Sequence, residues 1–194
     1  MIICGFSGIG KTFCADNFPR VIDFENKRVV GSHSYSVMES TFKMFDDMGY
    51  DVLLDIRMVP ILKSIGTIQF SVVIPSIHLK DEYIERYLKM GKPKDFIKDM
   101  SDNWEKRINT YLMDYDISVD TLTEGQYLSN RFLGWSSSFQ SAFGLSLVNR
   151  NELKDKLRQI DSTEWEYNNP RQKVYDIIDG LNEYKISRKE SVKV

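Results

Sequence analysis

A segment near the start of the chain has the residue types and spacing of a phosphate-binding loop. Gly5-Phe-Ser-Gly-Ile-Gly-Lys-Thr12 matches the Walker A pattern G-x-x-x-x-G-K-[ST] in full. In such a loop the glycines let backbone N–H groups surround a phosphate, and the helix that follows favours negative charge. The lysine reaches the β- and γ-phosphates, and the Ser or Thr hydroxyl is a ligand for Mg²⁺. The predicted nucleotide contacts are Gly5, Ser7, Gly8, Ile9, Gly10, Lys11 and Thr12.

An acidic residue ends an apolar run farther along the chain. In Val52-Leu-Leu-Asp55 the carboxylate stands where a Walker B acid would hold Mg²⁺, directly or through water. A simple cap at the end of a strand is the alternative interpretation of Asp55. Arg57 follows two residues later, and we expect it to meet the acceptor or the transferred phosphate. The predicted metal ligands are therefore Thr12 and Asp55.

Two more carboxylates follow the apolar pair Val21 and Ile22. Asp23 and Glu25 are two residues apart, so the strand period places them on one side of the chain. The carboxyl ends of strands line the ligand crevice in doubly wound sheets. One carboxylate would then orient Mg²⁺-bound water, and the other would accept a proton from an acceptor hydroxyl. An acidic surface turn is the alternative interpretation.

Basic residues are frequent between about residues 79 and 113. A cationic lid that closes over phosphates would have this composition, because phosphoryl transfer requires neutralisation of charge on the phosphate oxygens. The alternative for most of these lysines is a solvated helix face, since acidic residues alternate with them. Arg86 is the candidate for phosphate contact, because arginine binds phosphate in a bidentate manner. The basic residues are Lys80, Arg86, Lys89, Lys92, Lys94, Lys98, Lys106 and Arg107.

Short apolar runs alternate with longer amphipathic stretches along the chain. This alternation predicts an α/β fold, with a five-stranded parallel sheet covered by helices. Residues 1–131 form the predicted core, with a helical lid at about 79–113 that is interrupted once at Gly91-Lys-Pro93. Residues 132–194 form a predicted C-terminal appendage, partly helical and partly irregular. The predicted strands are 1–4, 20–24, 51–55, 68–74 and 117–122, and the other predicted helices are 11–18, 34–48 and 60–65.

Composition narrows the classes of protein. The chain has 194 residues, 42% of them hydrophobic, which excludes disorder over most of its length. Its net charge of -2 disfavours a globally basic nucleic-acid binder. No apolar run reaches the roughly 18–20 residues of a membrane span, and no signal peptide is recognisable, so we expect a cytoplasmic protein without membrane partners. Cys4 and Cys14 are expected to be free thiols, and the separation of His33 from His78 argues against a zinc site.

Residues 1 to about 132 resemble the small P-loop kinases of bacteriophages, which have the adenylate/thymidylate kinase type of fold. The lid segment is more specific evidence for this resemblance than the loop is, because it contains several uncommon residues in the same order. Related lids often have Arg-Tyr-x-x-Arg-Gly, whereas this chain has Met90 in place of the second arginine. The resemblance rests on Gly5–Thr12, Val21–Glu25, Val73–Pro75, Leu79–Tyr87, Phe96-Ile97, Asn103-Trp104 and Leu122–Ser129.

The loop pattern by itself is shared by ATPases, GTPases, motors and kinases. The guanine-specificity motif Asn/Thr-Lys-x-Asp is absent from the sequence, which disfavours a GTPase. The resemblance implies an ATP- and Mg²⁺-dependent phosphotransferase that acts on a nucleotide or nucleoside-like acceptor. One alternative is a kinase that phosphorylates 5-hydroxymethyluracil in phage DNA, and another is a non-catalytic NTP-binding module. The candidate catalytic residues are Lys11, Asp23, Glu25, Arg57 and Arg86.

Overall fold

A computed structural model of the chain describes residues 1–18, 20–24 and 35–131. The predicted appendage at 132–194 and the candidate base Glu25 lie outside the described residues. None of the helices within the described ranges has both the length and the apolar character needed to cross a bilayer.

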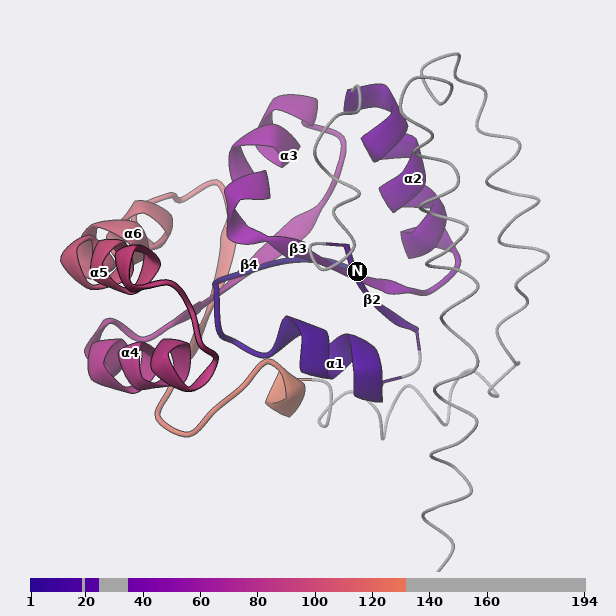
Figure 1. Ribbon diagram of the computed structural model, residues 1–194. Helices are drawn as coiled ribbons and strands as arrows, with labels where there is room; N and C mark the ends of the chain where they lie inside the picture. The colour runs from indigo at the N-terminus through magenta and orange to yellow at the C-terminus, as the bar shows by residue number, and fades with distance from the viewer. Residues whose placement is uncertain (19, 25–34, 132–194) are drawn as a thin grey trace, which may run out of the picture.

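Five parallel strands form one sheet in the order β2-β3-β1-β4-β5, with β1 in the middle (Figure 1). The α/β architecture and the five-stranded parallel sheet that the sequence predicts are therefore confirmed. At the carboxyl end of β1, Gly5 is in register with Asp55 of β3 and with Val73 of β4. The strands are β1 (Ile2–Gly5), β2 (Val21–Asp23), β3 (Asp51–Asp55), β4 (Phe70–Pro75) and β5 (Ser118–Leu122).

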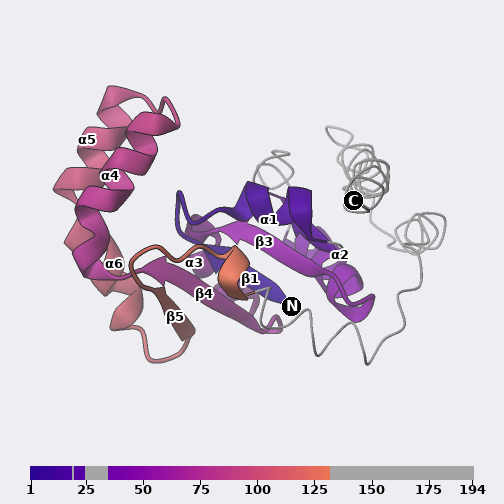
Figure 2. The ribbon, with the colours of Figure 1, turned by 90° about the horizontal axis from the view of Figure 1, so that it is seen from below.

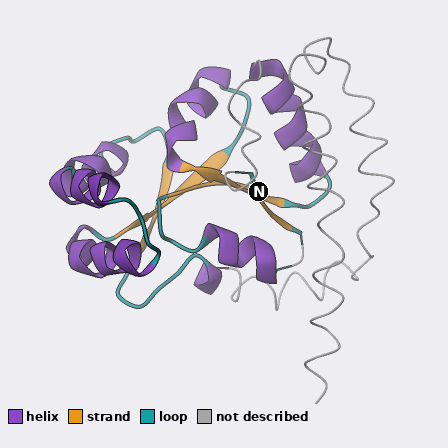
Figure 3. Cartoon of the chain, viewed as in Figure 1, coloured by secondary structure: helices purple, strands orange, loops and turns teal. Residues whose placement is uncertain are grey.

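Helices cover both faces of the sheet. Helix α1 (Lys11–Asn17) lies on one face, and α2 (Tyr35–Asp47) and α3 (Val59–Ile65) lie on the other (Figure 3). Both faces of the central strands are consequently buried, which explains why β1 and the middle of β3 are apolar throughout. Two 3₁₀ turns, η1 (Ile56–Met58) and η2 (Ile77–Leu79), precede α3 and the helix that begins at Lys80.

Three helices occupy the segment that the sequence predicts as a lid of two. They are α4 (Lys80–Lys89), α5 (Lys94–Asp102) and α6 (Trp104–Leu112), grouped beside one another in Figure 2. The predicted break at residues 91–93 is present, and a second break at Asn103 was missed. The Asn103 side chain donates to the Asp99 carbonyl at 3.1 Å, and such local bonds compete with helix continuation.

The second break places an aromatic side chain in the core. Trp104 is 1% exposed, and its ring packs edge-on against Phe6 with centroids 5.6 Å apart. The indole Nε1 donates to the Ile77 carbonyl at 2.7 Å. Burial of this large side chain, with its N–H satisfied, compensates for the interrupted helix.

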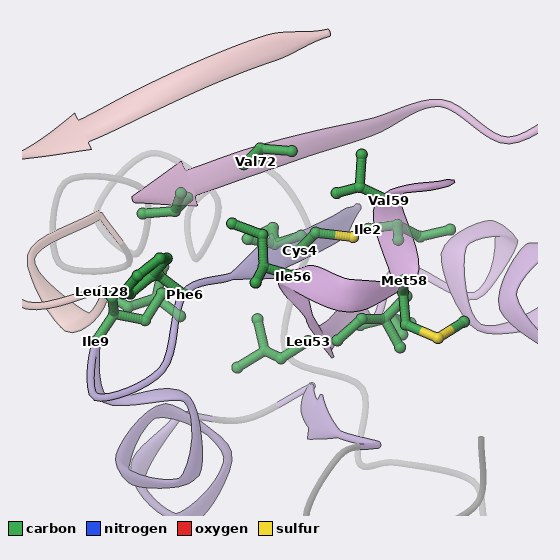
Figure 4. Packing of buried hydrophobic residues seen from close by; sticks show 14 of the residues in the cluster. Ile2, Cys4, Phe6, Ile9, Leu53, Ile56, Met58, Val59, Val72 and Leu128 are labelled. Atoms are coloured by element: carbon green, nitrogen blue, oxygen red, sulfur yellow. The ribbon is translucent and has the colours of Figure 1, made fainter. Parts of the chain in front are cut away.

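A continuous cluster of buried side chains joins the sheet to the loop that follows β1 (Figure 4). Phe6 and Ile9 of this loop are buried, and they lie close to Leu128 at one end of the cluster. The loop is therefore anchored in the core through its own apolar side chains.

We predict that Leu53→Ala lowers the free energy of unfolding by about 2–5 kcal/mol, because it opens a cavity in the middle of β3. Leu53 is 0% exposed, whereas Leu88 on α4 is 61% exposed. The control Leu88→Ala should stay within about 0.5 kcal/mol of wild type. Urea unfolding followed by circular dichroism measures both, and equal effects of the two substitutions would contradict the described core.

Candidate functional site

The Gly5–Thr12 loop lies where neighbouring strands send their connections to opposite faces of the sheet. The chain leaves β1 for α1 on one face and leaves β3 for α3 on the other (Figure 1). In open parallel sheets this divergence creates a crevice at the carboxyl ends of the strands, where ligands bind. The predicted nucleotide loop and the carboxylates that end β2 and β3 are thus at the same edge of the sheet.

Close contacts or backbone conformation favour glycine at three positions of the loop. A Cβ on Gly5 would lie 2.6 Å from the Ile9 Cδ1 and 3.0 Å from the Lys11 Cδ. Gly8 and Gly10 have φ angles of 81° and 97°, which side-chain-bearing residues rarely adopt. The compact path of the loop depends on these three glycines.

Lys11 is the charged group inside the loop. Its side chain is folded back over Gly5, and its Nζ donates to the carbonyls of Gly5 at 2.8 Å and Phe6 at 3.1 Å. The residue is only 7% exposed, although it carries a full charge. Below it in β1, burial raises the pKa of the Cys4 thiol. The Asp55 carboxylate adds to this pKa shift and Lys11 opposes it.

The predicted metal ligand Thr12 is paired with the carboxylate that ends β2. Its Oγ1 donates to Asp23 Oδ2 at 3.0 Å, and Asp23 is 7% exposed. The structure therefore brings together one predicted ligand and one predicted catalytic carboxylate. Burial raises the pKa of the Cys14 thiol to about 12, and the Asp23 carboxylate contributes to that shift.

Asp55, the other predicted metal ligand, caps the η1 turn. Its Oδ1 accepts from the Arg57 backbone N at 2.8 Å and from the Arg57 Nε at 2.6 Å. The Arg57 side chain is 78% exposed beyond this contact. The capping interpretation is therefore realised, while metal binding by Asp55 and phosphate contact by Arg57 stay predictions.

Arg86 of α4 is held against the loop. Its guanidinium lies between two aromatic rings, 4.4 Å from the Tyr83 centroid and 3.9 Å from the Tyr127 centroid. It forms an ion pair with Glu82 and donates from Nη1 to the Gly8 carbonyl at 3.3 Å. The residue singled out for phosphate contact thus touches the loop backbone itself.

Two lysines of the lid segment fit the alternative of solvated helix faces. The ammonium groups of Lys89 and Lys98 lie 3.5 Å and 3.2 Å from Glu85 and Asp102, four residues away along their helices. Both lysine side chains are 79% exposed. Met90, at the end of α4, is 56% exposed.

Two contacts to the loop were missed by sequence reasoning. The Tyr87 hydroxyl donates to the Ser7 carbonyl at 2.9 Å, and the Leu128 backbone N donates to the Ile9 carbonyl at 2.9 Å. Tyr83 and Tyr87 are spaced like any buried face of an amphipathic helix, so no sequence signal assigns them to the loop.

No group of three or more His, Cys, Asp or Glu side chains that could hold a metal was found within the described ranges. Magnesium does not require such a group, since it is commonly bound through one or two carboxylates together with phosphates and water. The Thr12 hydroxyl, Asp23 and Asp55 at one sheet edge fit that requirement.

Comparisons with known proteins return no match, either among protein-family models, curated proteins or solved structures. The fold and site define a class only: an α/β protein with a five-stranded parallel sheet and a glycine-rich loop after its central strand.

We predict that Cys4 and Cys14 react very slowly with a maleimide at pH 8 in the native protein. Both are buried, and a pKa of about 12 leaves Cys14 protonated at that pH, whereas the thiolate is the reactive form. In 8 M urea, used as a denaturing control, both should react at the rate of a free thiol. Mass spectrometry counts the labels, and rapid native labelling at either position would contradict the described packing.

Proposed function

We propose that this protein is an ATP- and Mg²⁺-dependent phosphotransferase acting on a nucleotide or nucleoside-like acceptor. One observation carries the proposal. A full Walker A segment follows the central strand of a parallel sheet, and its lysine is buried inside the loop, next to a Thr12–Asp23 pair. A buried cation beside a glycine-rich backbone is suited to bind phosphate.

In this proposal the loop binds the phosphates of ATP through its backbone N–H groups and Lys11. The ammonium is nearly buried, so its attraction for a phosphate is weakened less by water than that of a surface lysine. Thr12 and Asp55 would hold Mg²⁺, with Asp23 acting on it directly or through water. When bound, the metal supplies neutralisation of charge on the phosphate oxygens.

Three further candidate residues, Asp23, Glu25 and Arg57, divide between the metal and the acceptor. Because Asp23 accepts a hydrogen bond from Thr12, we assign it to the metal side, which leaves Glu25 as the candidate base. The exposed guanidinium of Arg57, held by Asp55, is suited to contact with the transferred phosphate. We prefer a hydroxyl acceptor, on a nucleoside, a sugar or a hydroxymethylated nucleobase. A hydroxyl must lose its proton and so makes use of a general base such as Glu25, whereas a phosphate acceptor does not.

A second function is supported by the state of Arg86. Its guanidinium contacts Glu82 and the Gly8 carbonyl, so it is engaged by protein groups as well as stacked on rings. An arginine held by protein groups in this way is compatible with a non-catalytic module. In such a module the loop would bind NTP and change conformation without transferring phosphate. Formation of ADP from MgATP with a panel of acceptors distinguishes the two functions. The panel contains nucleoside monophosphates, nucleosides and DNA with 5-hydroxymethyluracil.

We predict that Lys11→Ala weakens MgATP binding by at least about tenfold and abolishes phosphoryl transfer, since a charged hydrogen-bond donor is worth about 1.5–3 kcal/mol. The control Lys98→Ala removes an exposed lysine on α5 and should bind like wild type. Isothermal titration calorimetry measures both affinities. Wild-type affinity in Lys11→Ala would rule out the assignment of the loop to phosphate binding.

We predict that Glu25→Gln slows transfer to a hydroxyl acceptor by about 10²–10⁴-fold with ATP affinity intact, the usual contribution of a positioned base. Asp23→Asn should instead raise the Mg²⁺ concentration needed for the half-maximal rate, because a carboxylate that helps to hold the metal is lost. Single-turnover transfer with the acceptor identified by the panel measures both rates. If Glu25→Gln transfers phosphate at the wild-type rate, the acceptor is a phosphate group, which needs no base. A wild-type response to Mg²⁺ in Asp23→Asn would contradict the place of Asp23 on the metal side.

A further inference from the structure

We infer that Tyr87 and Arg86 of α4 are positioning residues that fix the direction of the peptide groups in the Gly5–Thr12 loop. The inference rests on the proposed phosphate binding by this loop. It explains how the backbone N–H groups are oriented toward a phosphate before the phosphate binds. Neither residue is required to touch the nucleotide in this role.

Consecutive carbonyls of the loop receive donors from outside the loop. The Ser7 carbonyl accepts from the Tyr87 hydroxyl at 2.9 Å, and the Gly8 carbonyl accepts from the Arg86 Nη1 at 3.3 Å. The next carbonyl, that of Ile9, accepts from the backbone N of Leu128 at 2.9 Å. Three peptide groups in succession are thus held from the side of α4 and the segment after β5.

Peptide geometry converts these contacts into a direction for the N–H groups. The described backbone has no cis peptide bond, and in a trans peptide the C=O and the following N–H point in opposite directions. When the carbonyls of residues 7, 8 and 9 face α4 and Leu128, the N–H groups of Gly8, Ile9 and Gly10 face away from them. Successive N–H groups turned to one side are the donors that an anion needs.

Glycine-rich backbone would not keep this arrangement unaided. Gly8 and Gly10 have access to many backbone conformations, so their peptide groups are free to rotate unless neighbouring groups hold them. Fixing them before the ligand arrives reduces the conformational entropy lost on binding. The donors from α4 therefore raise the affinity for phosphate because they order the loop before the ligand binds.

The Tyr87 hydroxyl is itself held firmly. Tyr87 is 0% exposed and packs edge-on against Tyr83 and Phe96, with centroids 6.2 Å and 5.2 Å away. A Cβ on Gly8 would lie 2.9 Å from the Tyr87 Cε1, so glycine at this position lets the ring approach the loop. Burial raises the pKa of Tyr87, which keeps the hydroxyl protonated and able to donate.

Arg86 is fixed from several sides. The rings of Tyr83 and Tyr127 enclose its guanidinium, and Glu82 pairs with it. Its Nη2 also donates to the Gln126 carbonyl at 3.3 Å, which links α4 to the segment after β5. Both donors to the loop from α4 are thus part of one packed unit.

The test compares Tyr87→Phe with Tyr50→Phe. Each substitution removes one hydroxyl from a buried tyrosine, but Tyr50 is next to the amino end of β3, at the opposite end of the strand from the loop. Residual dipolar couplings of the Gly8, Ile9 and Gly10 N–H bonds, measured by NMR without ligand, report the direction of each bond. Calorimetry with inorganic pyrophosphate and with MgATP reports the affinity, and thermal unfolding reports stability.

In Tyr87→Phe we expect altered couplings, first at Gly8, and affinity for both probes reduced roughly three- to tenfold, the net effect of one hydrogen bond. Tyr50→Phe should leave the couplings and affinities at wild-type values whatever its effect on stability. Unchanged couplings in Tyr87→Phe, or altered couplings with unchanged affinity, would overturn the inference. If the couplings change but the wild-type protein binds neither probe, the proposed function fails while the orienting role of Tyr87 stands.

Discussion

The ammonium of Lys11 is nearly buried at the carboxyl end of β1, and the surrounding loop is arranged to accommodate its charge. A buried cation is costly unless polar groups compensate it, and here the carbonyls of Gly5 and Phe6 point at it. The side chains of Lys11 and Ile9 pass so close to Gly5 that a Cβ there would force them to shift. The loop backbone thus supplies the acceptors for the lysine, and glycine at position 5 leaves room for its side chain.

This arrangement depends on a helix that is distant in the sequence. Strand β4 lies next to β1, and the Phe6 backbone N donates to the Val73 carbonyl at 2.9 Å, so the loop starts beside the end of β4. The chain then enters α4, whose Arg86 and Tyr87 donate to loop carbonyls. Strand order thus brings the helix to the loop. It also gives the predicted lid segment a structural contact with the phosphate site that we propose.

Sequence periodicity was sufficient to predict most of the helices and strands. Apolar runs bounded by turn residues predicted the five strands to within a few residues, because strands buried on both faces need continuous apolar sequence. The break at Asn103 was missed, since no glycine or proline marks it. A local side-chain hydrogen bond from Asn103 accompanies the end of α5 there, and the burial of Trp104, which depends on tertiary contacts, favours the break.

The sequence by itself determined the fold class and the Walker A segment, because strand periodicity, glycine spacing and the lysine are local properties of the chain. Only the tertiary structure decided what the side chains around the loop touch. It pairs Thr12 at the start of α1 with Asp23 at the end of β2. It also turns Arg86 and Tyr87 toward carbonyls 78 and 80 residues earlier in the chain. Such pairs follow from strand order and packing, which no short-range pattern encodes.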